Sequence, residues 1–437
     1  MKKAFIIILA FSLMFLLVGC NKDNSQIYDS KGELITEFKK ASTRENDINN
    51  AYIDIVFKET LEILMKEKNL EKEQAEKEIY NDYKIYTFCD TEIISNINKA
   101  YKNINKDVDF GSAVTDLDGK LIAVYSSPSD TNFSAQKNPP YSTIKPLAVY
   151  CQALESNQIN WSSMIDDSPF KKIKDENGIT RDWPSNATNT YLSEPVTIHY
   201  ALKESLNTVA VKVLNDYGVK NSIDFLMQNF GINLKTEAYK ANIFGGEEVV
   251  GNIALGYTIG GESTIDMAGY YQIFANGGNY TPPSAIKKIT DKTGKVIYEN
   301  KSVSKRIISE ETSYIMNELL QGVVSVGGTG EKAFCTEVAV AGKTGTGDDN
   351  SGNWFVGVTP EYSCAVWHSN CKNNYAAEIF SNIIKSTDIN IKDFRTSSNV
   401  VKKIYCKESG KLFSAKCTQV EMGYYTADNI PTICDKH

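Results

Sequence analysis

The chain has 437 residues, of which 42% are hydrophobic and 23% charged, with 28 glycines and 11 prolines. This composition is typical of globular proteins, excludes collagen, coiled coils and low-complexity tails, and at about 150 residues per domain suggests two or three units. The net charge of −7 comes without a basic stripe that could follow phosphates, so nucleic acid is not expected as a partner.

The first twenty residues have the pattern of a signal peptide. Two lysines precede an apolar run, residues 4–18, which is too short to cross the roughly 30 Å hydrocarbon core of a bilayer. The run ends in Leu-Val-Gly-Cys20, which resembles the lipobox of bacterial lipoproteins. The resemblance implies that residues 1–19 are removed and that Cys20 carries lipid, which would hold the chain on the extracytoplasmic face of the cell membrane. A plain secretory signal with an unrelated cysteine is the alternative.

Residues 20–106 are predicted to form a mainly helical linker or pedestal. Ile53, Val56, Phe57 and Leu61 recur at helical spacing, and glutamates and lysines fill the positions between them. Nothing in this segment indicates a catalytic unit.

A change in composition near Val108 marks a larger domain, predicted over residues 107–386. Asp118-Gly119 lies between two β-rich runs, which predicts a hairpin. Further patterns follow in chain order: helical periodicity over 142–154, 197–217, 264–275 and 310–323, strands over 337–342, 354–359 and 362–367, and a closing helix over 376–384. Strands, then helices, then strands predict an α+β fold with an antiparallel sheet whose parts are distant in the sequence.

Eight cysteines remain after Cys20, in a compartment where disulfides can form. Cys89, Cys151 and Cys335 lie in apolar surroundings and are interpreted as small buried hydrophobes. Cys364 and Cys371 flank a short turn-like stretch, where a bridge could close.

A cysteine-bearing tail is predicted over residues 387–437. Cys406, Cys417, Cys434 and His437 follow one another there with 10, 16 and 2 residues between them. This spacing lacks the paired Cys-x-x-Cys of a confident zinc site. We therefore assign no metal and no cofactor from the sequence, and favour a disulfide or free thiols for the tail.

Three short motifs follow one another within residues 107–386, and the first two supply a nucleophile and a base. They are Ser142-Thr-Ile-Lys145, Ser205-Leu-Asn207 and Lys343-Thr344-Gly345. A serine hydroxyl becomes a nucleophile when a base within hydrogen-bond reach takes its proton. On a helix, residues i and i+3 share a face, and burial or a nearby cation can make a lysine neutral. Ser142 is thus the candidate nucleophile and Lys145 the candidate base.

The other motif residues are expected to assist. Ser205 would relay a proton, and the Asn207 amide would orient the lysine and the substrate. The third motif follows a predicted strand with which an extended substrate could pair. Lys343 with Thr344 or Thr346 would bind a terminal carboxylate, while Gly345 would permit close backbone approach, and the N–H groups of Ser142 and Thr346 would form an oxyanion hole. Each motif alone also fits a solvated helix face, a helix cap or a turn.

With its flanking sequence, the trio resembles the transpeptidase domain of penicillin-binding proteins, in particular the class A branch. The matching stretches are residues 141–155, 205–212, 254–258 with 274–278, and 341–346 with 354–357. The resemblance implies the serine penicillin-recognising fold and a D,D-transpeptidase that attacks peptidoglycan stem peptides through Ser142 and is acylated by β-lactams. Partners would then be stem peptides, β-lactams, the membrane and cell-wall synthesis proteins.

The sequence departs from the family pattern in two respects. The stretch before residue 107 is too short for the glycosyltransferase domain of class A members, so polymerising activity is not expected. Tyr141 stands where the family usually has glycine, and Leu206 where a second serine is common.

Three alternatives to a transpeptidase stay open. A D,D-carboxypeptidase would use water as the acceptor. A β-lactamase would need fast deacylation, and no Glu-x-x-Leu-Asn of the class A β-lactamases lies between Asn207 and Lys343. A non-catalytic sensor or cell-wall tether would keep the pocket and act through partners bound to the N-terminal segment.

Overall fold

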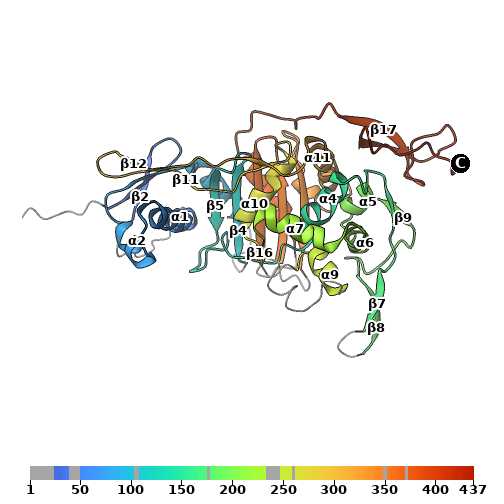
Figure 1. Ribbon diagram of the computed structural model, residues 1–437, viewed down its shortest axis with the longest axis horizontal. Coiled ribbons are helices and arrows are strands. Elements are labelled where there is room, and N and C mark those ends of the chain that lie inside the picture. The colour runs from blue at the N-terminus through green and yellow to red at the C-terminus, as the bar shows by residue number, and fades with distance from the viewer. Residues whose placement is uncertain are drawn as a thin grey trace, which may run out of the picture.

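The computed structural model describes residues 24–38, 50–102, 108–174, 178–232, 247–257, 261–347, 352–369 and 373–437. The predicted signal peptide, Cys20 and Cys371 lie outside these ranges. Among the residues described, none of the helices combines the length and the apolar character needed to cross a bilayer. The molecule is elongated, with an N-terminal unit at one end, a helix-and-sheet domain in the middle and the tail at the other end (Figure 1).

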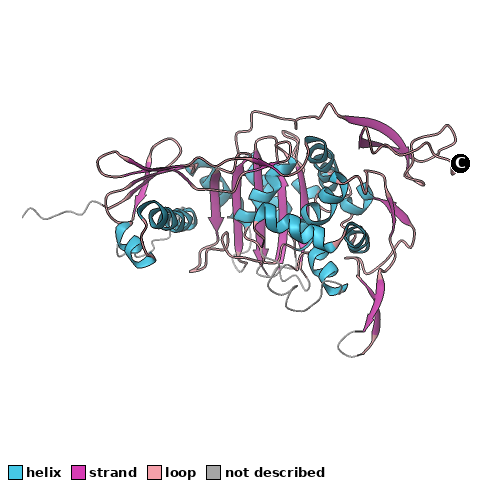
Figure 2. Cartoon of the chain, in the orientation of Figure 1, coloured by secondary structure: helices cyan, strands magenta, loops and turns pink. Residues whose placement is uncertain are grey.

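The central domain is built on a five-stranded antiparallel sheet with the order β14-β15-β16-β4-β5. The strands are β4 (Phe110–Asp116), β5 (Leu121–Ser126), β14 (Ala341–Thr346), β15 (Gly352–Val358) and β16 (Tyr362–Ser369). Every residue of β15 is buried, as expected for a central strand covered by helices (Figure 2). The predicted α+β class, the Asp118-Gly119 hairpin and the distant origin of the strands are confirmed.

Besides α1 (Asn50–Lys68), which contacts β5, four helices pack against this sheet. Helix α10 contacts β4 and β16, α11 contacts β14, α12 contacts β15 and β16, and α3 contacts β5. They are α3 (Thr91–Tyr101), α10 (Thr264–Tyr271), α11 (Glu310–Val324) and α12 (Ala376–Lys385), with short 3-10 turns at Gln272–Phe274 and Glu331–Ala333. The helices predicted over 264–275, 310–323 and 376–384 are confirmed.

A second group of helices forms the part of the central domain beside β14 (Figure 1). They are α4 (Cys151–Glu155), α5 (Ile198–Lys203), α6 (Asn207–Tyr217), α7 (Val219–Phe230) and α9 (Glu247–Leu255). The helix predicted over 142–154 is instead a 3-10 turn (Tyr141–Ile144), a π turn (Pro146–Tyr150) and α4. The helix predicted over 197–217 breaks at Ser205, whose φ is 60°.

Short strands complete this domain. They pair as β6 (Met164–Asp166) with β9 (Pro195–Thr197), β7 (Lys171–Lys174) with β8 (Thr180–Trp183), and β10 (Asn279–Tyr280) with β13 (Lys305–Arg306).

The N-terminal unit contains α1 (Asn50–Lys68) and α2 (Lys72–Glu78), but it also contains a sheet. The strand order is β12-β11-β3-β1-β2. The strands are β1 (Gln26–Tyr28), β2 (Leu34–Glu37), β3 (Lys84–Thr87), β11 (Ile286–Thr290) and β12 (Val296–Glu299). The mainly helical prediction for 20–106 is therefore incomplete. Strands of three or four residues carry little periodic signal, and two of the five come from inside the predicted central domain.

One predicted strand is displaced along the chain. The pattern predicted a strand over 337–342 with the Lys343 motif directly after it, whereas β14 spans Ala341–Thr346. Lys343 and Thr344 therefore lie within the edge strand, and both are buried. The small apolar residues before Ala341 misled the prediction, because buried polar residues break the alternation on which it rests.

The tail is a hairpin of β17 (Val400–Cys406) and β18 (Val420–Thr426). It docks on the central domain through two buried tyrosines, Tyr405 and Tyr425. The Tyr425 hydroxyl donates to Ser162 Oγ at 2.8 Å. All seven described cysteines are free thiols, and Cys89, Cys151, Cys335 and Cys364 are buried as small apolar residues. Of the two states expected for the tail cysteines, a disulfide or free thiols, the structure has free thiols at Cys406, Cys417 and Cys434.

Candidate active site

Ser142 lies in the 3-10 turn that opens the buried helical segment. Tyr141, just before it, has a φ of 47°, a left-handed conformation that favours glycine, as the family pattern has at this position. The Tyr141 N–H donates to the Gly256 carbonyl at 3.2 Å. A Cβ on Gly256, whose own φ is 79°, would lie 2.1 Å from the Tyr141 carbonyl oxygen. Glycine at 256 therefore allows the turn to sit where it does.

The Tyr141 side chain is directed into the protein. It is 7% exposed, and its ring packs edge-on against Tyr257 with 5.7 Å between ring centroids. Ser142 itself is partly exposed, and its hydroxyl makes no hydrogen bond to any described residue. A 3-10 turn aligns residues i and i+3, so Ser142 and Lys145 share one face of the turn, as their spacing predicts.

The strand β14 closes on the turn from one side. A Cβ on Gly345 would lie 2.8 Å from the Pro140 carbonyl oxygen and 3.0 Å from Thr143 Cγ2, so any side chain there would displace the turn. From β15, the Trp354 indole N–H donates to the Pro139 carbonyl at 2.9 Å. The third motif is thereby held against the first.

Lys145 joins the first motif to the second. Its Nζ donates to Asn207 Oδ1 at 2.7 Å and to the Ser205 carbonyl at 2.8 Å, and it lies 3.4 Å from Ser205 Oγ. The side chain is fully buried. Burial, with the positive charge of Lys343 as a second cause, holds the pKa of Lys145 well below its usual range. A lysine of this kind can be neutral and accept a proton.

The Asn207 amide is fixed by residues that the sequence analysis missed. Its Nδ2 donates to the Ser185 carbonyl at 2.7 Å, and its backbone N–H donates to Asn186 Oδ1 at 2.9 Å. Asn186 is buried and donates in turn to Asp167 Oδ1 at 2.8 Å. These contacts turn the carbonyl oxygen of the Asn207 side chain towards Lys145. Ser185 and Asn186 lie in a loop without periodic pattern, so no local signal marked them.

Lys343 is the second fully buried lysine of the site. Its Nζ donates to the Thr344 carbonyl at 3.2 Å and lies 3.4 Å from Thr344 Oγ1. Burial lowers the pKa of Lys343 to about 7, although Glu204 opposes the shift. The Thr344 hydroxyl donates to Thr329 Oγ1 at 3.0 Å. Thr329 was also missed, although three glycines surround it in the sequence.

The fold brings all three motifs together at the β14 edge of the central sheet. Lys145, Ser205 and Asn207 are joined by hydrogen bonds, and β14 carries Lys343, Thr344, Gly345 and the exposed Thr346 beside the turn that holds Ser142. Within the described residues β14 pairs only with β15, so its other edge is available to an extended peptide. A serine on the same face of a turn as a lysine whose pKa is lowered by burial, beside an open strand edge, suits acyl transfer from a peptide.

The comparison with protein families gives one match over most of the central domain. The model described as "Penicillin binding protein transpeptidase domain" matches residues 110–385. Penicillin-binding protein 1A of Clostridium acetobutylicum is 33% identical over 354 residues, which cover 73% of this chain and 42% of that protein. Penicillin-binding protein 4 of Bacillus subtilis is 30% identical over 322 residues, covering 70% and 48%. The chain thus spans less than half the length of these relatives.

Solved structures share the fold. Penicillin-binding protein 1A from Haemophilus influenzae superposes with a TM-score of 0.69 at 15% identity, covering 94% of this chain and 99% of that one. The D,D-transpeptidase domain of a peptidoglycan glycosyltransferase from Eggerthella lenta gives a TM-score of 0.60 at 17% identity, covering 83% and 97%.

Proposed function

The chain belongs to the penicillin-binding protein transpeptidase family, and on that premise we propose that it is a D,D-transpeptidase that cross-links peptidoglycan stem peptides. One observation carries the proposal: the buried Lys145 amine bonds to Asn207 and Ser205 and lies on the same face of a 3-10 turn as Ser142. The contacts supply a base for the serine and no histidine is required.

Acylation would begin with attack of Ser142 Oγ on the carbonyl carbon of the D-Ala-D-Ala amide. Neutral Lys145 takes the serine proton as the new C–O bond forms. The N–H groups of Ser142 and Thr346 hold the developing oxyanion. The C–N bond then breaks, and the leaving D-Ala amine receives a proton relayed from Lys145 through Ser205. The acyl group remains on Ser142 as an ester.

Transfer would reverse these proton movements. An amine from a neighbouring stem peptide attacks the ester, Lys145 takes its proton, and the C–O bond to Ser142 breaks as the serine oxygen is reprotonated. The product is a new amide between two stem peptides. With water as the acceptor the same steps would yield only a shortened peptide.

Substrate binding is assigned to β14. The donor peptide would pair with the free edge of the strand, and its terminal carboxylate would contact Lys343, Thr344 and Thr346. Protonated Lys343 and two hydroxyls form a set of donors suited to a carboxylate. The same carboxylate is present in β-lactams, which supports covalent inhibition at Ser142.

The test is to incubate the purified chain with a stem pentapeptide and an amine acceptor, and to analyse the products by mass spectrometry. Cross-linked product is expected in the wild type and absent from Ser142→Ala. Tetrapeptide without cross-linking would overturn transpeptidation in favour of carboxypeptidation, and an unchanged pentapeptide would favour a sensor or tether.

We further propose that Cys20 anchors the chain by lipid on the extracytoplasmic face of the membrane. The apolar run and the Leu-Val-Gly-Cys20 pattern support this. In a bacterial host, Cys20→Ala is expected to move the protein from the membrane fraction to the soluble fraction, because stable anchoring depends on the acyl chains. Cys335→Ser, which alters a buried cysteine, is the matched control. Equal membrane retention of both variants would contradict lipid anchoring.

A further inference from the structure

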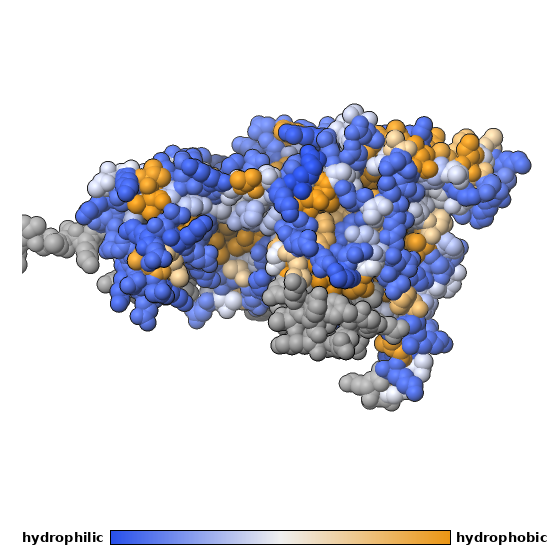
Figure 3. All heavy atoms as spheres, viewed as in Figure 1, coloured by the Kyte–Doolittle hydropathy of each residue, from blue (hydrophilic) through white to orange (hydrophobic). Residues whose placement is uncertain are grey.

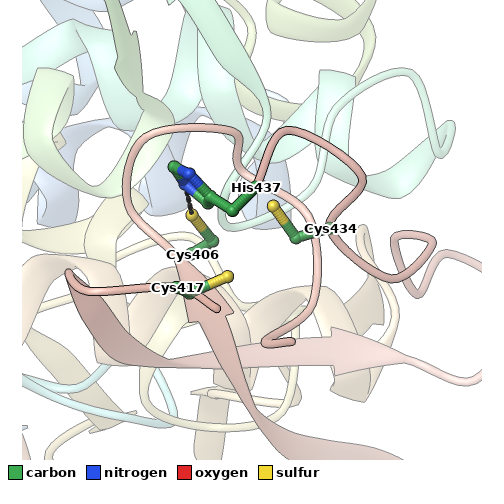
Figure 4. Close-up of side chains that lie close together, drawn as sticks. All are labelled: Cys406, Cys417, Cys434 and His437. Carbon is green, nitrogen blue, oxygen red and sulfur yellow. Dashed lines mark hydrogen bonds between the residues drawn. The ribbon is translucent and has the colours of Figure 1, made fainter. Parts of the chain in front are cut away.

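A second cluster of reactive side chains lies in the tail, outside the active site. Cys406 ends β17, Cys417 lies in the loop before β18, and Cys434 and His437 follow β18. Figure 4 shows the four side chains pointing towards one another from three separate stretches of the chain. One sulfur or ring nitrogen from each residue lies within 4.8 Å of all the others. Cys406 Sγ and His437 Nε2 are 3.5 Å apart.

We propose that Cys406, Cys417, Cys434 and His437 bind a structural zinc ion. Zinc in proteins is tetrahedral, with Zn–S near 2.3 Å and Zn–N near 2.0 Å, so ligand sulfurs lie about 3.8 Å apart and a sulfur and a nitrogen about 3.5 Å apart. The separation of Cys406 Sγ from His437 Nε2 meets the second value. Four protein ligands complete the tetrahedron and leave no position for substrate, which makes the site structural.

The surrounding backbone holds the ligands in place before any metal arrives. The Cys406 N–H donates to the Lys411 carbonyl, and the Cys434 N–H to the Leu412 carbonyl, each at 2.8 Å. Cys406 and Cys434 are therefore tied to neighbouring residues of one loop. A site whose ligands are already placed loses little ordering entropy on binding metal.

Two further groups donate hydrogen bonds to the sulfurs. The Ser409 hydroxyl donates to Cys434 Sγ at 3.2 Å, and the Ser414 N–H donates to Cys417 Sγ at 3.4 Å. Donors of this kind favour the thiolate over the thiol, and thiolates are the form that binds zinc. When Zn²⁺ binds, the three thiols give three protons to the solvent, and the imidazole binds as the neutral ring.

The tail has little apolar core to stabilise it. Ile404, Phe413 and Ile433 are 45%, 45% and 67% exposed, and Figure 3 shows apolar surface at the end of the molecule that holds the tail. A two-stranded hairpin is marginally stable by itself, and small units of this kind often depend on a metal or on disulfides. A disulfide would use two of the three cysteines and leave the third thiol and the imidazole without a role.

The zinc site would also fix the contact between the tail and the central domain. Gly410, four residues after Cys406, packs so closely that a Cβ there would lie 2.2 Å from the Ser162 carbonyl oxygen. The Ser162 hydroxyl donates to the Gly410 carbonyl at 2.6 Å. Asn429 Nδ2 donates to the Ile159 carbonyl at 2.9 Å. Ordering the loop around Cys406 therefore orders the surface that docks.

The test measures metal content of the purified full chain by inductively coupled plasma mass spectrometry, after dialysis without chelator. About one zinc per chain is expected, falling at least tenfold in Cys406→Ser and in Cys417→Ser, because each lost thiolate weakens zinc binding strongly. Cys335→Ser, a buried cysteine that contacts Ser381, should keep the metal. Covalent labelling by fluorescent penicillin reports in parallel whether the central domain of each variant is folded.

Cobalt replacement gives a second readout that does not depend on the variants folding. The wild-type chain with Co²⁺ should show intense visible bands of a tetrahedral ion and sulfur-to-cobalt charge-transfer bands. A zinc-free chain whose tail thiols all react with a thiol reagent would overturn the proposal. So would a disulfide between two tail cysteines, or zinc that stays in both variants.

Discussion

Replacement of Ser142 by alanine is expected to abolish covalent labelling of the purified chain by a fluorescent penicillin. The wild type should take up about one label per chain, since Ser142 shares a face of the 3-10 turn with Lys145, whose pKa burial holds well below its usual range. The variant keeps Lys145, Ser205 and Asn207 but has no oxygen to carry the acyl group. Labelling is read by gel fluorescence, and the stoichiometry by intact mass.

The matched control is Ser156→Ala. Ser156 is exposed at the end of α4, on the same helical segment, and its hydroxyl donates to the Ala153 carbonyl at 3.2 Å. Its labelling should equal that of the wild type. Labelling that persisted in Ser142→Ala would assign the acyl group to another side chain and contradict the site.

Replacement of Lys343 by methionine should have opposite effects on stability and on labelling. Methionine fills a similar volume without a charge, so the variant no longer buries an ammonium group whose hydrogen-bond partners in the described residues, the Thr344 carbonyl and hydroxyl, are uncharged. With a pKa lowered by burial to about 7 from an ordinary value of 10.5, the native lysine costs on the order of 4 kcal/mol of stability at pH 7. Labelling should fall roughly 10- to 100-fold, because a hydrogen bond to a charged group contributes about 1.5–3 kcal/mol.

The pH dependence follows from the same shift in pKa. The unfolded chain holds the Lys343 proton up to about pH 10.5 and the folded chain only up to about 7. Between these values the unfolded state binds more protons, so the stability of the wild type rises with pH. The gain from Lys343→Met should therefore be largest at or below pH 7 and fall to roughly half at pH 9.

Thermal unfolding at pH 7 and pH 9 measures this difference. Lys212→Met is the control, because Lys212 donates to the Asp166 carbonyl at 2.7 Å and to Ser168 Oγ at 3.0 Å, and its loss should not stabilise the protein. A Lys343→Met variant no more stable than the wild type at pH 7 would contradict the cost assigned to burial.

Features that depend on neighbouring residues were predictable from the sequence. The hairpin between β4 and β5 was found because Asp118-Gly119 forms the turn, and Gly119 has the positive φ, 83°, that such turns require. The three motifs were found because catalysis requires certain residue types at close spacing. Only the family resemblance implied that the motifs converge. Lys145 and Ser205 are sixty residues apart, and a hydrogen bond between such distant residues produces no recognisable pattern in the local sequence.

Features that depend on distant contacts were not predictable. Strand β1 pairs with β2 and with β3, and β3 pairs with β11, some two hundred residues later. No periodicity in the sequence indicates such a distant partner. Asn186 and Thr329 support Asn207 and Thr344 from loops, and the approach of these loops depends on the whole fold. The four tail residues lacked a paired spacing, so their convergence appears only in three dimensions.

The N-terminal sheet takes two of its strands, β11 and β12, from the later part of the chain, and this has a mechanical consequence. Within the described residues the chain passes from the N-terminal unit into the central domain after β3. It returns to the N-terminal unit with β11 and re-enters the central domain after β12. Two domains joined by a single chain segment can rotate about that segment, whereas two domains joined by three segments resist both bending and twisting. A pull on the N-terminal unit is therefore transmitted to the central domain, whose 3-10 turn carries Ser142, through three segments of chain and not through one flexible linker.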